Sequence, residues 1–214
     1  MLRNSTLYVC LKGLAAAVLL CGGVPCHAAE SQIVLLYNTA HVAPEVTIQA
    51  KDQASRILRE AGILLQWADC SPDLHGQLAD PRCAEFFSKR SLIVHMAASA
   101  GQFPNKKSLA YSVVDRSGGN QTVVFLDRVA KFTTESKPLF GLGQVLGHVM
   151  AHEMGHLLLS LVDHTPKGIM KACWGPKELQ RIADGELLFT PLEAAKMQEK
   201  LRRRASSNPA DRNR

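Results

Sequence analysis

Apolar and polar positions divide the chain into short runs typical of strands and longer stretches with the period of a helix. The predicted strands cover residues 33–37, 63–67, 92–96, 109–114 and 122–126. The last two flank a glycine-containing segment at 116–120 that indicates a hairpin. The predicted helices cover residues 44–61, 142–161, 176–184 and 191–204. This order predicts an α/β (α+β) domain, with a small mixed, twisted sheet packed on the helix at 142–161 and further helices after it.

Two columns of residues run along the predicted helix 142–161, because residues four apart lie on the same face. One column is small and consists of Gly143, Gly147, Ala151 and Gly155. We expect it to let the helix approach the sheet closely. The other column is polar and consists of Gln144, His148, His152 and His156. We expect that column to face a cleft.

His152, Glu153 and His156 form an HExxH motif within this helix. The two imidazoles, one turn apart, can point to the same ion, while Glu153 can reach a water without binding the ion. Zn²⁺ in such a site promotes hydrolysis, with the carboxylate as general base. A chance triplet in a buried structural helix is the competing interpretation, although a buried glutamate is costly without a partner.

A catalytic zinc normally takes three protein ligands, so a third must come from outside the motif. His148 lies about 12 Å from His156 along the helix axis, which is too far to share an ion. It is expected to support the ligands, to line the cleft or simply to pack. His164 follows the helix in a segment with turn residues and is the favoured third ligand. Glu178, in a later predicted helix, is the alternative.

The motif, His164 and the segment ending in Met170 resemble the metzincin branch of zinc metallopeptidases, with its HExxHxxGxxH motif and Met-turn. Residues 141–191 are more closely similar to small secreted bacterial proteins with the pattern HExxHLLLGxxxHSxxGIM, described as metzincin-like proteases. The resemblance implies that Met170 lies beneath the metal without binding it. It also implies that an edge strand, 111–115 or 122–126, aligns an extended peptide substrate.

Two features of this sequence depart from those families. His164 comes two residues later than the third histidine of the metzincin motif, and Ser160 stands where the narrower group has glycine. Serine enters a left-handed helix-ending turn less readily than glycine. We therefore expect the turn after the helix to be built differently.

The N-terminal segment is typical of a secretory signal peptide. Arg3 and Lys12 precede a short apolar run, and small residues surround the expected cleavage point after Ala28. The run is too short to span a membrane. The prediction is a signal peptide at 1–28, a single catalytic domain at 29–201 and a basic flexible tail at 202–214, in a monomer that is secreted or periplasmic.

The basic charge of the chain is concentrated at its ends. The whole chain has 25 basic and 19 acidic residues, but two of the basic residues lie in the signal peptide. The tail adds five arginines against one aspartate, so the domain between them is close to neutral. We therefore expect no nucleic-acid partner.

Three of the six cysteines remain after removal of the signal peptide. Cys70 and Cys83 flank a polar, turn-rich segment and are predicted to form a disulfide in an exported protein. Cys173 is then unpaired. It is expected to be a packed thiol beside the site, with a regulatory thiolate ligand as the alternative.

These observations predict a secreted zinc metalloendopeptidase with one Zn²⁺ per chain, bound by His152, His156 and His164. Glu153 is the predicted general base, and a peptide or protein the predicted substrate. The alternatives are a hydrolase with Glu178 as third ligand and a zinc-containing peptide-binding protein with little turnover. A structural domain with an accidental HExxH motif is the third.

Overall fold

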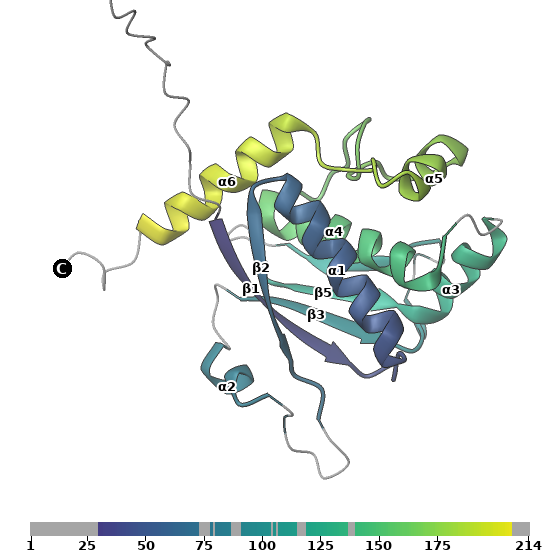
Figure 1. The fold of residues 1–214 in the computed structure, drawn as a ribbon, viewed down its shortest axis with the longest axis horizontal. Coiled ribbons are helices and arrows are strands. Elements are labelled where there is room, and N and C mark those ends of the chain that lie inside the picture. Colours follow the sequence, from purple (N-terminus) through teal and green to yellow (C-terminus); the bar gives the residue numbers. More distant parts are fainter. Residues whose placement is uncertain are drawn as a thin grey trace, which may run out of the picture.

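The computed structural model describes residues 30–206, except 73–77, 79, 87–90, 104, 106, 115–118 and 137–139. Its strands are β1 (Glu30–Asn38), β2 (Ile63–Asp69), β3 (Leu92–Ala97), β4 (Ala110–Val113) and β5 (Gln121–Phe125). Its helices are α1 (Pro44–Glu60), α2 (Arg82–Phe86), α3 (Leu126–Glu135), α4 (Leu142–Leu159), α5 (Pro176–Ala183) and α6 (Pro191–Ser206) (Figure 1). Every predicted strand and helix is present within a few residues, whereas α2 and α3 were not predicted.

The strands form one mixed sheet in the order β2-β1-β3-β5-β4. β4 pairs antiparallel with β5, and the other three pairings are parallel. β4 is therefore an edge strand, and β5 lies inside the sheet. Of the two segments considered for peptide alignment, 111–115 begins in the edge strand. The alternative at 122–126 is wrong, because both edges of β5 are already paired.

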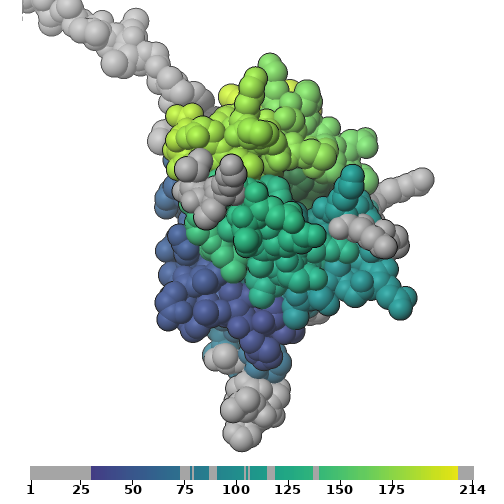
Figure 2. Space-filling model, turned by 90° about the vertical axis from the view of Figure 1, so that its right-hand side faces the viewer, coloured from purple at the N-terminus to yellow at the C-terminus, as the bar shows by residue number. Residues whose placement is uncertain are grey.

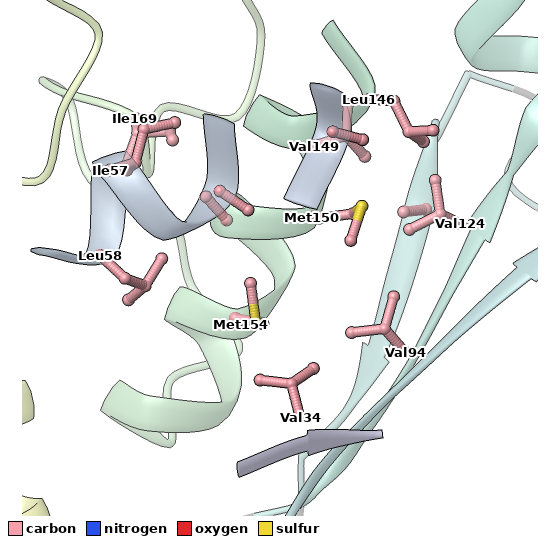
Figure 3. Close-up of a cluster of buried hydrophobic side chains, with 14 of the residues drawn as sticks. Val34, Ile57, Leu58, Val94, Val124, Leu146, Val149, Met150, Met154 and Ile169 are labelled. Atoms are coloured by element: carbon pink, nitrogen blue, oxygen red, sulfur yellow. The ribbon is translucent and has the colours of Figure 1, made fainter. Parts of the chain in front are cut away.

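Helix α4 packs on one face of the sheet through its apolar side chains. Met150 and Met154 point toward Val34, Val94 and Val124 of the central strands, and all five are fully or almost fully buried (Figure 3). These strand residues share the helix side because Val94 pairs with Leu36, two residues after Val34, and Val124 pairs with Met96, two residues after Val94. Residues two apart in a strand face the same way. Fully burying a side chain of this size stabilises a fold by about 1.5–3 kcal/mol. The core therefore holds the predicted motif helix firmly against the sheet.

The column of small residues on α4 does not face the sheet, contrary to our expectation. A Cβ atom at Gly143 would lie 2.9 Å from the carbonyl oxygen of Val46, and one at Gly147 would lie 2.6 Å from that of Ala50. Both carbonyls belong to α1, so these glycines let two helices approach each other. The sheet side of α4 needs large apolar residues instead, because it must fill the space above the pleated strands.

The opposite face of the sheet has a smaller core. Leu35, Ala68 and Ile93 pack there with Cys70 and Cys83, which form the predicted disulfide. The disulfide joins the end of β2 to α2, below the sheet in Figure 1.

Two sequence predictions concern the ends of the chain. The predicted signal peptide lies outside the described residues. α6 continues to Ser206, so the first part of the predicted tail is helical, and residues 207–214 are not described. Within the described part of the chain, none of the helices combines the length and apolar character needed to cross a membrane.

Candidate metal centre

The structure brings together the three histidines singled out by the sequence. His152 and His156 come from the last turns of α4, and His164 comes from the segment that follows the helix. One ligand nitrogen from each ring lies within 4.8 Å of those of the other two. His152 and His156 are almost completely buried, whereas His164 is exposed. The cluster therefore lies at the boundary between the core and solvent.

The two helix histidines are held so that their Nε2 atoms face each other. Nδ1 of His152 lies 2.7 Å from the carbonyl oxygen of Ile169, and Nδ1 of His156 lies 2.7 Å from that of Leu161. A carbonyl only accepts, so each Nδ1 donates, and each neutral ring keeps its lone pair on Nε2. Burial lowers the pKa of His152 to about 3 and also lowers the pKa of His156, which favours these neutral forms.

The spacing of these lone pairs suits a zinc ion. The Nε2 atoms of His152 and His156 are 3.2 Å apart. Two nitrogens at tetrahedral positions on one zinc, each about 2.0–2.1 Å from it, are separated by about 3.3 Å. Two unprotonated nitrogens this close repel each other unless a cation lies between them. The residues present therefore fit a zinc ion.

Helix α4 ends in a left-handed turn at Ser160, with φ 47° and ψ 46°. The amide of Leu161 donates to the carbonyl of His156, and the Leu161 carbonyl accepts from His156 Nδ1. The expectation of a differently built turn is therefore wrong: serine itself adopts the conformation that glycine favours. The same turn directs the chain back toward His164 and orients the His156 ring.

Met170 is buried beside the histidine helix. A Cβ atom at Gly155 would lie 2.5 Å from the Met170 sulfur. The Met170 side chain therefore packs against α4 at Gly155, a residue between His152 and His156 in the sequence. The Met170 carbonyl accepts a hydrogen bond from the amide of Thr165, the residue after His164. Met170 thus closes the loop that carries His164.

Glu153 lies in the same cleft and is buried. Its Oε2 is 2.7 Å from the hydroxyl of Ser112, which belongs to the edge strand β4. Burial raises the pKa of Glu153 to about 7, and the hydrogen bond from Ser112 offsets part of that rise. A carboxyl group whose pKa lies near neutrality can both accept and return a proton under ordinary conditions.

His148 is completely buried and does not line the cleft. Its Nδ1 lies 2.8 Å from the carbonyl oxygen of Gln144, and its Nε2 lies 3.4 Å from the amide nitrogen of Gln53. Its ring meets Trp174 edge-on, and Trp174 in turn meets His152 edge-on. His148 therefore packs behind the histidine cluster rather than lining the cleft.

Two residues of the site were not identified from the sequence, namely Ser112 and Trp174. Trp174 Nε1 donates to the carbonyl of Ile169, the same oxygen that accepts from His152 Nδ1. A polar residue within the apolar edge strand was the only sequence signal for Ser112. Nothing in the pattern around Trp174 indicated its role, because its bond to Ile169 lies in an irregular segment without a repeat and its ring contact with His152 spans 22 residues.

Glu178 and Cys173 were the alternative metal ligands considered from the sequence. Glu178 forms an ion pair with Lys171 at 2.7 Å and accepts from the amide of Gly175 at the start of α5, so its carboxylate is engaged away from the histidines. Cys173 is exposed and lines the cleft, which contradicts the expectation of a packed thiol.

The cleft around the histidines has a volume of about 610 Å³. One wall is formed by the edge strand and α3, including Tyr111, Ser112 and Phe132, and the other by the segment after α4, including Val162 and Trp174. Glu153 and the three histidines lie between these walls. An extended chain could thus lie along β4 and pass over the candidate ligands.

Comparisons with known proteins add little to this geometry. The sequence matches no protein-family model, and no curated protein matches it. Among solved structures, the chain is similar to archaemetzincin from Methanopyrus kandleri, with 14% sequence identity and a TM-score of 0.47. The match covers 84% of this chain and 99% of that chain. A likeness this distant carries no functional inference, so the chemistry of the site rests on its own residues.

Proposed function

We propose that this protein is an exported zinc-dependent metallopeptidase. The observation that carries the proposal is the convergence of three histidines whose two buried members present lone pairs 3.2 Å apart, beside a buried glutamate. His152, His156 and His164 would hold one zinc per chain. When bound, the ion would supply the Lewis acidity that makes water a nucleophile at neutral pH.

Glu153 is assigned the proton transfers. Its Oε2 is held by Ser112, so its other oxygen can accept a proton from the attacking water and pass it to the leaving amine. The elevated pKa, caused by burial, suits both steps. Ser112 lies on the edge strand, so the strand that would align the peptide also orients the base.

The metal-binding part of the proposal is tested by comparing two single variants. His164→Ala should lose zinc, whereas Glu178→Ala should retain it, because Glu178 is engaged with Lys171 and the start of α5. Metal analysis of the purified proteins gives the answer. The reverse result would assign the third ligand to Glu178, and a wild-type protein without zinc would favour a purely structural domain.

The catalytic part is tested by digestion of a mixed peptide library. Wild-type protein should cleave peptides, and Glu153→Gln should cleave at least about 10²-fold more slowly while keeping its zinc. Zinc without cleavage in the wild type would favour a peptide-binding protein with little turnover. Loss of zinc in Glu153→Gln would show that Glu153 supports the ligands instead.

Export is tested independently of the chemistry. The disulfide between Cys70 and Cys83 supports an oxidising compartment, since such bonds are rare in the cytosol. We expect native protein outside the cytoplasm to begin near Ala29. N-terminal sequencing of that material checks the site, and an intact N-terminus would contradict it.

A further inference from the structure

Glu193, in the first turn of the C-terminal helix α6, is buried although it is charged, with a relative exposure of 4%. Its Oε2 accepts from the amide of Thr190 at 2.7 Å, and its own amide lies 3.3 Å from the Thr190 hydroxyl. This reciprocal pair is a capping box, which satisfies the free amides at a helix start. The cap occupies only one of the two carboxylate oxygens.

The second oxygen of Glu193 reaches the segment that carries His164. Its Oε1 lies 2.7 Å from the hydroxyl of Thr165, the residue directly after His164. The same hydroxyl lies 2.9 Å from the carbonyl oxygen of Lys167, but the carboxylate is closer and is the stronger acceptor. A buried carboxylate thus holds the backbone beside the exposed candidate ligand.

Helix α6 also contacts the other end of the same segment. Lys200 Nζ donates to the carbonyl of Leu159, the last residue of α4, at 3.1 Å. The loop from Ser160 to Thr165 is therefore attached to α6 before and after His164. Its own backbone supplies further ties, from the Leu161 amide to His156 and from the Thr165 amide to Met170.

We propose that Glu193 is a positioning residue for His164, which it holds in ligand geometry through the hydroxyl of Thr165. The proposal rests on the function proposed above. His152 and His156 have direct carbonyl partners on their Nδ1 atoms, whereas the exposed His164 depends on the position of its backbone. Fixing that backbone reduces the entropy lost when the third ligand binds the metal.

The test compares two threonine-to-valine variants that each remove one hydroxyl from the same α6 contact region. Thr165→Val removes the link to the ligand loop and leaves the cap, whereas Thr190→Val weakens the cap and leaves the link. Zinc affinity is measured by competition with a chelator, and stability by urea unfolding. Thr165→Val should weaken zinc binding about 10-fold or more, as expected for a group that orients a ligand. Thr190→Val should lower the urea midpoint without changing zinc affinity.

Unchanged zinc affinity in Thr165→Val, or an equal loss in both variants, would overturn the proposal. A second measurement uses metal-free protein with labelled histidine rings, observed by NMR relaxation. The His164 ring should become more mobile in Thr165→Val but not in Thr190→Val, and an unchanged ring would again contradict the role of Glu193. If the wild type binds no zinc, the proposed function fails. The mobility of the His164 ring in the metal-free protein still tests whether Glu193 positions His164.

Discussion

Two features of Ser160, where the chain leaves the histidine helix, are unfavourable for the stability of the fold. Its backbone is left-handed, which costs a residue with a Cβ atom roughly 1–2 kcal/mol relative to the right-handed form. Its hydroxyl is buried without a hydrogen-bond partner among the described residues. The turn is nevertheless required, because it brings the Leu161 carbonyl to His156 Nδ1. The site therefore depends on a conformation that this residue does not favour.

Ser160→Gly should raise the free energy of unfolding by about 1 kcal/mol, since it relieves both costs at the expense of a more flexible unfolded chain. Ser160→Ala serves as the matched control, because it removes the hydroxyl but keeps the backbone strain. Urea unfolding should rank glycine above alanine. Equal stability of the two variants would mean that the strain of the left-handed turn does not exceed the entropy that glycine adds to the unfolded chain.

The Ser112 hydroxyl is the contact that orients the carboxylate of Glu153. Ser112→Ala should lower kcat/KM by about 10-fold, because a hydrogen bond to a charged group contributes about 1.5–3 kcal/mol. Zinc content should not change, since among the described residues the Ser112 hydroxyl bonds to Glu153 and to none of the three histidines. Kinetics on a cleaved library peptide checks the loss. Full activity in the variant would show that packing alone holds Glu153.

At the scale of single elements, α4 differs from an ordinary surface helix because it is buried on nearly every side. The two sides of the helix need side chains of different size. Large residues such as Met150 fill the space on the sheet side, whereas the α1 side leaves no room for a side chain at Gly147. The helix can therefore neither rotate nor shift without creating a cavity on one side and a clash on the other.

Gly147→Ala should destabilise the protein by about 1–3 kcal/mol, the usual cost of overpacking. The new Cβ atom would lie 2.6 Å from the Ala50 carbonyl oxygen, a backbone atom that cannot move aside easily. Alanine's better helix propensity, worth about 1 kcal/mol, works in the opposite direction. Gly141→Ala is a control for the steric effect alone, because its Cβ atom would meet only the Gln49 side chain, at 3.7 Å, and because this N-cap residue lies outside the helix interior. Thermal unfolding of both variants checks the difference.

At the scale of the whole molecule, the site is assembled from segments spread over most of the domain. Ser112 comes from the edge strand, three site residues come from α4, and the supporting contacts come from the loop and α6. On the face shown in Figure 2, the C-terminal segments in yellow-green lie above the middle of the chain, with the N-terminal segments in purple below. The disulfide lies outside this assembly, on the other face of the sheet.

Replacing Cys70 and Cys83 by serine should therefore reduce stability without altering zinc content. The disulfide closes a loop with a sequence separation of 13, for which the chain-entropy model gives about 3 kcal/mol. Cys173→Ser is the control, because this exposed cysteine forms no disulfide with another described residue. Urea unfolding and metal analysis measure the two effects separately. Zinc loss in the double variant would mean that the disulfide region reaches the site.

The sequence predicted much of the fold because its patterns are local. Alternation and helical period located each strand and four of the six helices in the described part of the chain. α3 was missed although its apolar residues Leu126, Val129 and Phe132 recur at helical spacing, because it follows β5 without an intervening turn and its first residue, Leu126, was assigned to the predicted strand. The HExxH spacing and His164 predicted the ligand cluster, because residues four apart on a helix must share a face.

Other features were decided only by tertiary structure. Periodicity shows that one face of a helix carries small residues and another carries large ones, but not which neighbouring element each face contacts. The glycines of α4 face α1 rather than the sheet. Ser112, Trp174 and Glu193 act through partners 5 to 41 residues away, and no local pattern encodes such contacts. By itself the sequence singled out the residues that we propose to bind a metal and to move a proton. The packing of strand, helix and C-terminal segment decided which groups orient them, because orientation depends on neighbours that only folding brings together.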